Sequence, residues 1–262
     1  MPTSTTLYQS YRLHYERMSN LPPDWQAAER DPKDFALNNP WFVAFASRPW
    51  LPSDKKAKIL DLGCGWGHQL LALWHAGYHR IEGVDLVAEQ VETCNGGAAG
   101  RFQVHCMGGI EFLSDKIDVY DLVILNDVIE HVPVPEAVPL LRAVFEALVP
   151  GGCVVLRTPN MSSISAMHSR YIDLTHVTGY TEFSIQQLLD QAGFRDHCFV
   201  PDNYGINRKS WRPWIPWRGL GIRCFLNHCL HRYMYWLRGQ GNAPKIFNYN
   251  IEVYSHKSTE SK

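Results

Sequence analysis

The sequence predicts an α/β fold in which helices cover both faces of a doubly wound, mostly parallel sheet. Between residues 58 and 200, short apolar segments alternate with segments whose apolar residues recur at helical spacing. One of the apolar segments, YDLVILND, is almost entirely hydrophobic, which is typical of a strand buried on both faces. Strands that alternate with helices are joined by right-handed crossovers, and repeated crossovers build a parallel sheet.

Length and composition predict one large domain with additions. The chain has 262 residues, of which 45% are hydrophobic and 19% charged, so it can bury a sizeable core. Its 25 basic and 26 acidic residues leave a net charge of -1, so no overall field attracts nucleic acid or another acidic polymer. The seven cysteines include no C-x-x-C pair, which favours buried free thiols over a disulfide framework or a zinc ribbon.

The N-terminal segment, residues 1–50, is expected to form a helical cap. It is rich in aromatic residues and is interrupted by prolines, which favour short helices and loops over a sheet. The first twenty residues lack the charged start and apolar run of a secretory signal, and no stretch reaches the roughly 18 uncharged apolar residues of a membrane span. We therefore expect a cytoplasmic protein.

The core of the fold is expected within residues 51–202. Its strands and helices follow one another as KILDLGCG (strand), HQLLALWHAGY (helix), IEGVDL (strand), AEQVETCNGG (helix), RFQVHCM (strand), YDLVILND (strand), a helix from about Glu136 to Leu148 that stops at Pro-Gly-Gly, and CVVLRTPN (strand). A further helix is capped by Thr181 and ends at Gly193. Two strands, FRDHCFV and IFNYNIEVYSHK, close the sheet, and residues 245–262 supply the second of them and a tail.

The first predicted strand ends in a glycine-rich loop, ILDLGCGWG, which carries Gly63, Gly65 and Gly67. Glycine lets the backbone approach a ligand more closely than any β-carbon permits. The dinucleotide fingerprint G-x-G-x-x-G would need glycine where His68 stands, and the Gly-Lys-Ser or Gly-Lys-Thr of a phosphate loop does not occur. The loop predicts a ligand site of another kind, with a simple tight turn as the alternative.

A carboxylate at the end of the second predicted strand strengthens the ligand interpretation. Asp85 closes IEGVDL, 18 residues beyond Gly67, where a carboxylate can accept hydrogen bonds from both hydroxyls of a ribose. Ligands of open α/β sheets bind at the carboxyl ends of strands near the switch in strand order, and both motifs lie there. Asp61, inside ILDLG, either adds negative charge for a cationic ligand or braces the glycine loop.

Four segments together resemble a known family: ILDLGCGWG, GVDL, YDLVILNDVIEHV and LVPGGCVVLRTPN. They resemble the first, second, fourth and fifth motifs of the class I methyltransferases, across roughly residues 55 to 200. The resemblance implies a seven-stranded Rossmann-like sheet with an antiparallel last strand, S-adenosylmethionine over the first two strand ends, and substrate above the fourth. The cofactor-contacting residues that it implies are Asp61, Gly63, Gly65 and Gly67 at the methionine part, Asp85 at the ribose with Leu86 after it, Met107 and Gly108 at the adenine, and Asn126 near the donor methyl. The segment CMGGIEFL departs from the family, which often has an acidic residue there.

Polar residues at the end of the fourth strand form a candidate chemical site. Asp127, Glu130 and His131 occupy positions i, i+3 and i+4, which lie on one face of a helical turn. His176, in YIDLTHVTGYT, follows the fifth strand and is expected at the same rim of the sheet. This D-x-x-E-H with a later His resembles the metal-binding E-x-x-E-H plus His of the small-RNA 2′-O-methyltransferases. It is also similar to the EHV turn and Thr-His of the ubiquinone-biosynthesis O-methyltransferases.

Several interpretations of this site stay open. As metal ligands, Asp127, Glu130, His131 and His176 would suit Mn, Fe or Zn, or Mg with waters completing its shell. Without a metal, His131 or His176 is the best general base, because imidazole titrates near neutral pH, and Glu130 is a further catalytic candidate. Asp127 and Glu130 also have the spacing of a helix capping box, in which case His131 only packs against the cofactor.

Residues 203–244 form a predicted insertion that is basic and rich in tryptophan. From Asn203 to Ile251 there is no acidic residue, whereas eight are basic: Arg208, Lys209, Arg212, Arg218, Arg223, Arg232, Arg238 and Lys245. The insertion is a lid, an amphipathic element on an anionic membrane surface, or a cleft that stacks tryptophan on sugars or bases. We favour a lid that also contacts an anionic or lipid-linked substrate. The expected location is then the cytoplasm, with peripheral contact at the inner face of the membrane as an option.

The function expected from these features is O-methylation of a hydroxyl with S-adenosylmethionine as donor and, as an option, a divalent metal. The leading acceptor is a sugar or glycan of bacterial polysaccharide or lipopolysaccharide biosynthesis. The first alternative is a prenylated phenol or quinone precursor, and the second is a catalytically silent cofactor-binding subunit. RNA is a weaker candidate because only the insertion is basic.

Overall fold

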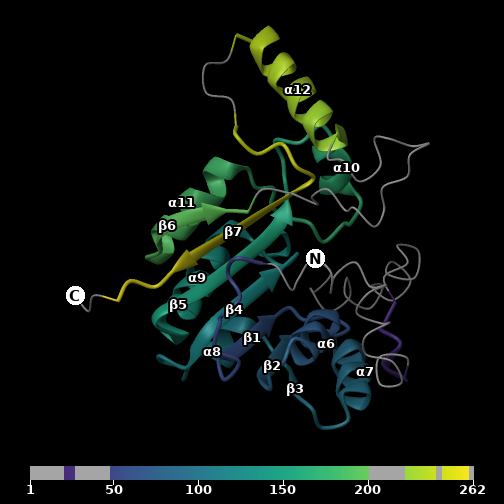
Figure 1. Ribbon diagram of the computed structural model, residues 1–262, viewed down its shortest axis with the longest axis vertical. Coiled ribbons are helices and arrows are strands. Elements are labelled where there is room, and N and C mark those ends of the chain that lie inside the picture. Colours follow the sequence, from purple (N-terminus) through teal and green to yellow (C-terminus); the bar gives the residue numbers. More distant parts are fainter. Residues whose placement is uncertain (1–20, 27–47, 201–221, 240–243, 260–262) are drawn as a thin grey trace.

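A computed structural model of the chain describes residues 21–26, 48–200, 222–239 and 244–259. Its strands form a seven-stranded sheet in the order β3-β2-β1-β4-β5-β7-β6 (Figure 1). The strands are β1 (Lys58–Leu62), β2 (Arg80–Asp85), β3 (Gln103–Cys106), β4 (Tyr120–Asn126), β5 (Leu148–Pro159), β6 (Arg195–Phe199) and β7 (Asn250–His256). Only β7 runs antiparallel to its neighbours. The predicted doubly wound, mostly parallel sheet with an antiparallel last strand is confirmed.

Helices cover both faces of this sheet. The helices in the described part of the chain are α6 (His68–His75), α7 (Ala88–Ala98), α8 (Gly109–Leu113), the short 3-10 helix η1 (Ile129–His131), α9 (Val134–Ala147), α10 (Ala166–Tyr171), α11 (Glu182–Ala192) and α12 (Ile222–Leu237). One core cluster packs α8, α9 and α11 against one face, and a second packs α6 and α7 against the other. Side chains of a strand alternate between these clusters, because successive residues point to opposite faces. In β4, Val123 and Leu125 join the first cluster, whereas Leu122 and Ile124 join the second.

The strand order places a topological switch point beside β1. This strand pairs with β2 on one side and β4 on the other, so the chain winds outward in opposite directions from it. The loops that follow β1, β2 and β4 therefore meet at one edge of the sheet, where open α/β folds bind their ligands.

Several predicted boundaries differ from the observed ones. The helix expected to stop at Pro-Gly-Gly ends at Ala147, and the strand after it begins at Leu148, before Pro-Gly-Gly, so Gly151, with a φ of +81°, lies within the strand. Helices α8 and α10 were not predicted; each has fewer than two full turns and so shows little periodicity. Most of the predicted N-terminal cap and residues 203–221 of the insertion lie outside the described residues, so the predicted domain boundaries stay predictions. None of the helices described here has the length and apolar character needed to cross a membrane.

Candidate functional site

The glycine-rich loop after β1 adopts backbone conformations that side chains rarely permit. Gly63 and Gly67 have φ angles of +79° and +80°. A β-carbon on Gly63 would lie 2.3 Å from Cγ2 of Val128, and one on Gly67 would lie 2.3 Å from Sγ of Cys94. Gly63 therefore lets the loop after β4 approach the loop after β1, which brings the predicted cofactor site and the predicted chemical site into contact.

Asp85 holds the glycine loop in place. Its Oδ2 accepts a hydrogen bond from the backbone N–H of Gly65 at 2.8 Å, and its Oδ1 accepts one from the N–H of Val87 at 2.9 Å. Burial raises the pKa of this carboxyl, and the backbone donors oppose that effect. A carboxylate has about four acceptor positions, so Asp85 can still accept a hydrogen bond from a ribose hydroxyl. The bracing role suggested for Asp61 thus belongs to Asp85.

Asp61 is a buried carboxylate that lacks a full set of partners. It is only 2% exposed, its Oδ1 lies 3.5 Å from Nε2 of Gln69, and its Oδ2 has no hydrogen-bond partner within the described part of the chain. Burial, together with the nearby charge of Asp85, raises its pKa from 3.8 to about 8. A cationic ligand would relieve this cost, so the geometry fits the ammonium and sulfonium of S-adenosylmethionine better than an apolar ligand.

Residues assigned to the adenine end lie together at the ends of β2 and β3. The N–H of Met107 donates to the carbonyl of Asp85 at 3.1 Å, and Gly108 precedes the first residue of α8. Leu86, which follows Asp85 directly, is 58% exposed, and this leaves apolar surface next to Asp85 for a flat heterocycle. The structure therefore brings together all the predicted cofactor residues of the first three strand ends.

The end of β4 corrects the expected role of Asp127. This residue has a φ of +56° and precedes the helical turn of η1, so the helical spacing expected to group it with Glu130 does not apply. Its Oδ2 instead forms an ion pair with Arg157 at 2.5 Å, and Arg157 also donates to Oδ1 of Asn126 at 3.1 Å. The capping box between Asp127 and Glu130 is not formed either, since η1 has no side-chain cap.

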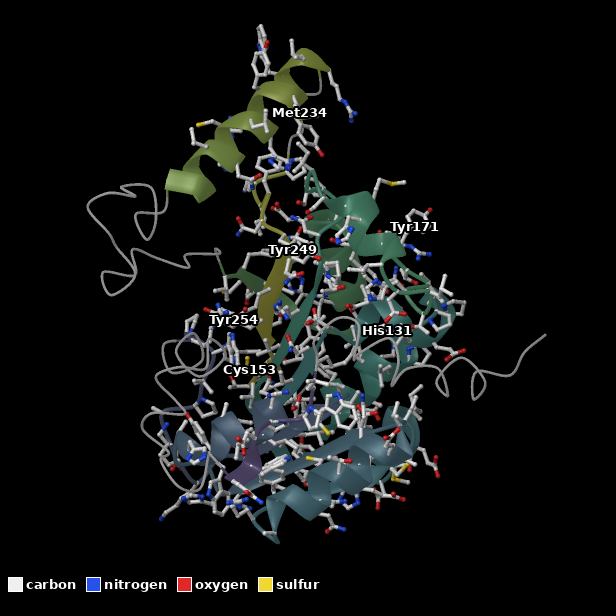
Figure 2. The ribbon with its side chains drawn as sticks, turned by 90° about the vertical axis from the view of Figure 1, so that its right-hand side faces the viewer. His131, Cys153, Tyr171, Met234, Tyr249 and Tyr254 are labelled. Carbon is white, nitrogen blue, oxygen red and sulfur yellow. The ribbon has the colours of Figure 1, made fainter. Side chains whose placement is uncertain are left out.

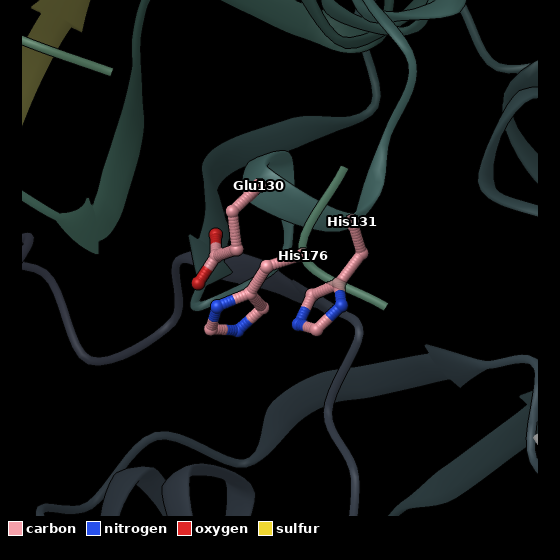
Figure 3. A group of neighbouring side chains, drawn as sticks. All are labelled: Glu130, His131 and His176. Atoms are coloured by element: carbon pink, nitrogen blue, oxygen red, sulfur yellow. The ribbon is translucent and has the colours of Figure 1, made fainter. Parts of the chain in front are cut away.

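Glu130, His131 and His176 converge just beyond β4 (Figure 3). Each offers one ligand atom, and these atoms all lie within 4.8 Å of one another. The two imidazole rings meet edge to face with their centroids 4.7 Å apart. His176 reaches Glu130 because the N–H groups of Val177 and Thr178 donate to the Glu130 carbonyl at 2.9 and 3.0 Å. Of the four predicted metal ligands, three are brought together and Asp127 is not.

The hydrogen bonds around the two histidines select one tautomer of each ring. Thr175 donates its hydroxyl hydrogen to Oδ1 of Asp173 at 2.7 Å, so Oγ1 of Thr175 accepts from Nδ1–H of His131 at 2.8 Å. Nδ1 of His176 lies 2.8 Å from the carbonyl of Ser169, which can only accept. In the neutral rings, both Nε2 atoms therefore carry the lone pair that a metal or a proton needs.

Glu130 completes a donor set that fits a divalent cation. The residue is 2% exposed, its Oε2 accepts from Oγ1 of Thr158 at 3.0 Å, and its Oε1 is buried without a hydrogen-bond partner among the described residues. Burial, and then the charge of Asp127, raises the pKa of this carboxyl well above its ordinary value. A buried carboxylate beside two imidazoles is a donor set that suits Mn, Fe or Zn.

Sequence reasoning missed the residues that orient this group: Val128, Arg157, Thr158, Asp173 and Thr175. The Thr-His pair at 175–176 was visible in the sequence, and it was a signal that Thr175 belongs to the site. Arg157 and Thr158 gave no such signal, because they act across strands and pair with residues about 30 positions earlier in the chain.

Comparison with known proteins shows which family the sequence matches. A family model described as a methyltransferase domain matches residues 40–198. The chain is 34% identical over 106 residues to a ubiquinone biosynthesis O-methyltransferase of Aeromonas salmonicida, covering 39% of this chain and 43% of that protein. It is 25% identical over 178 residues to the protein of the same name from Xanthomonas axonopodis, covering 64% and 70%. This chain spans about half the length of four of these curated relatives, from 43% to 50% of each.

A solved structure supports the fold alone. It is a SAM-dependent methyltransferase from Archaeoglobus fulgidus, with a TM-score of 0.58 and 19% sequence identity, and the superposition covers 80% of this chain and 89% of that one.

Proposed function

The chain belongs to the methyltransferase-domain family, and from this premise we propose that it methylates a hydroxyl oxygen held at Glu130, His131 and His176. S-adenosylmethionine is its methyl donor. The observation that carries the proposal is the convergence of those three side chains within 4.8 Å of one another, next to the glycine loop. Val128 packs against Gly63 and lies two residues before Glu130, so acceptor and donor sites share a wall.

The protein's own residues supply position, charge and a proton acceptor. S-adenosylmethionine, when bound, supplies a methyl group on a positively charged sulfur. Asp61 and Asp85 hold its cationic and ribose parts, and rigid alignment of donor and acceptor is worth roughly 7–11 kcal/mol at best. An alcohol must also lose its proton, and Nε2 of His131 or His176 can take it because each carries a lone pair. A divalent cation held by Glu130 and the two Nε2 atoms would lower the pKa of a coordinated hydroxyl.

The acceptor that we propose is a hydroxyl of a prenylated phenol or quinone precursor. The names of the curated relatives support this choice over the glycan expected from the sequence. A sugar hydroxyl remains the second candidate, supported by the basic, tryptophan-rich segment from Asn203 to Ile251. Both acceptors react through a hydroxyl oxygen, so one methyl-transfer assay can compare them.

The test is transfer of a labelled methyl group from S-adenosylmethionine to a panel of prenylated catechols and sugars. Each reaction is run with Mn²⁺ and with a chelator, using wild type, Glu130→Gln and the matched control Glu136→Gln, whose side chain is exposed on α9. We expect product from a catechol with Mn²⁺, little with chelator or with Glu130→Gln, and full activity for Glu136→Gln. Product formed equally with chelator would refute metal assistance and leave a histidine base. A protein that binds the cofactor but methylates no acceptor would be the silent subunit and would refute the proposal.

A further inference from the structure

Helix α12 is attached to the rest of the molecule by one side. Nδ2 of Asn227 donates to the carbonyl of Phe247 at 3.0 Å, and Nε2 of His231 accepts from the N–H of Ile164 at 2.7 Å. The His231 ring also stacks on Phe247 with the centroids 4.8 Å apart, and Tyr235 contacts the same ring at 5.6 Å. Residues 227, 231 and 235 are four apart, so they form one stripe along the helix.

The opposite side of α12 presents a row of large apolar side chains. Leu226, Leu230, Tyr233 and Leu237 are 59%, 46%, 56% and 62% exposed. Their spacing of i, i+4, i+7 and i+11 places them within an arc of ~60° at 3.6 residues per turn. On its two sides, this row is widened by Met234 and Trp236, which are 38% and 72% exposed. We call these six residues the apolar face of α12.

The helix projects from the end of the molecule, which leaves its apolar face accessible. Figure 1 shows α12 beyond the edge of the sheet at which β5 ends, next to α10. In Figure 2, turned by a quarter, Met234 again lies far above Cys153 in the body of the sheet. An exposed apolar face of this kind marks an interaction site rather than ordinary surface.

Every charged residue in the segment that carries this face is positively charged. The segment from Asn203 to Ile251 contains eight basic residues and no acidic one. Of the basic residues on or next to α12, Arg232 and Arg238 are exposed, and neither forms an ion pair with any residue that the structure describes. A partner of this surface must therefore tolerate or supply negative charge.

We propose that the apolar face of α12 docks on an anionic lipid surface, with its leucines in the acyl region and its arginines at the headgroups. Basic amphipathic helices with aromatic residues bind membranes in this way. Tyr233 and Trp236 suit the boundary layer, because their rings have an apolar body and a polar tip. The inference is independent of the reaction assigned to the protein.

A second copy of the chain is a weaker occupant. Leu226, Leu230, Tyr233 and Leu237 also follow a heptad spacing, which would suit a seam between two helices. Coiled coils pair opposite charges beside such a seam, whereas here the flanking positions hold Met234 and Trp236, and two copies would bring like charges together. The apolar face is also broader than a seam requires.

Helix α12 is anchored next to the segment that leads to the chemical site. The N–H of Ile164 that binds His231 belongs to the chain just before α10, and the residues after α10 carry Asp173, Thr175 and His176.

The experiment is co-sedimentation of the full chain with phosphatidylcholine vesicles, either neutral or containing about one third phosphatidylglycerol. Wild type is compared with Leu230→Glu/Leu237→Glu and with the control Ile117→Glu, which adds one such charge at a 73% exposed residue between α8 and β4. We expect wild type and the control to bind anionic vesicles, the double variant to bind at least about tenfold more weakly, and high salt to weaken binding. S-adenosylhomocysteine affinity and thermal unfolding establish that each variant is folded.

Equal sedimentation of wild type and the double variant, or no preference for anionic vesicles, would overturn the proposal. If wild type is instead a dimer in solution that the double variant dissociates, and no vesicle binding is seen, a second copy is the occupant and the proposal is wrong. If the double variant does not fold, Arg232→Glu/Arg238→Glu decides: binding should fall roughly fivefold per arginine, and unchanged binding would overturn the proposal.

Discussion

Binding of S-adenosylmethionine is expected to expel a proton from Asp61. In the ligand-free protein, burial and the neighbouring Asp85 raise the pKa of Asp61 to about 8, so the carboxyl is mostly protonated near neutral pH. A cation placed against the buried Oδ2 would favour the charged form and lower this pKa toward its usual value of about 4. Ligand binding and proton release at Asp61 are then the same event.

The size of the effect follows from the two pKa values. With a pKa of about 8, Asp61 carries roughly 0.9 proton at pH 7 and roughly 0.1 at pH 9 before binding, and close to none afterwards. We expect about 0.9 proton released per ligand at pH 7 and about 0.1 at pH 9. The raised pKa of Asp61 also makes the free energy of unfolding of the ligand-free protein depend on pH. A raised carboxyl pKa stabilises the fold at low pH, and this contribution is lost as pH rises through about 8. Asp61→Asn should therefore be more stable than wild type in alkaline solution, with the gap closing toward pH 5.

The assay is calorimetric titration in two buffers of different ionisation enthalpy, for wild type and Asp61→Asn. The amino group of the free ligand has a pKa near 8 and can take up only roughly 0.1–0.2 proton on binding at pH 7, so the difference in proton count between the two proteins at that pH chiefly reports Asp61. The variant should also bind roughly 10- to 100-fold more weakly through loss of a charged partner. Equal proton counts in the two proteins at pH 7 would refute the assignment of Asp61 to the cationic part of the cofactor.

Other predictions follow from single contacts. Gly67→Ala should destabilise the fold by about 2–4 kcal/mol, because the added β-carbon would lie 2.3 Å from Sγ of Cys94 in a residue with positive φ. Gly100 has the same φ of +80° but open space around it, so Gly100→Ala should destabilise the fold by only about 1–2 kcal/mol. Urea unfolding of both variants measures the difference. Thr175→Val removes the acceptor for Nδ1–H of His131 and should weaken Mn²⁺ binding about 10- to 100-fold, as measured by electron paramagnetic resonance. Thr175→Ser keeps the hydroxyl and should bind Mn²⁺ as wild type does. Equal Mn²⁺ affinity in all three proteins would exclude Thr175 as a positioning residue. His131→Ala and His176→Ala should each abolish turnover and leave S-adenosylhomocysteine affinity nearly unchanged, an expectation that normal turnover in either variant would contradict.

The cofactor half of the site could be predicted from the sequence because it depends on short segments. Gly63, Gly65 and Gly67 are needed for local backbone conformation, and Asp85 closes a strand that pairs in register with β1. Strand periodicity and the order of motifs place these elements at one edge of the sheet before any contact is known. The same logic predicted the sheet itself, including the antiparallel β7 implied by the family resemblance.

The chemical half of the site depends on contacts between distant residues, and there sequence reasoning was partly wrong. A helical spacing grouped Asp127 with Glu130, but the positive φ at Asp127 and the ion pair with Arg157 turn that carboxylate away. Asp173 and Thr175 orient His131 from a loop more than 40 residues later in the chain. The Thr-His pair at 175–176 is a signal for Thr175, but no local pattern indicates that its partners are His131 and Asp173. The apolar face of α12 was recognised as amphipathic, but only the structure shows which side of the helix is anchored.

The proposed function requires the donor methyl group to lie close to Glu130, His131 and His176, on the other side of the contact between Val128 and Gly63. Nuclear relaxation of the S-methyl group of bound S-adenosylmethionine, labelled with carbon-13 and measured with and without Mn²⁺, tests this directly. The account predicts strong paramagnetic broadening of the methyl signal in wild type and its loss in Glu130→Gln. A methyl signal that Mn²⁺ leaves unchanged while both ligands are bound would contradict it.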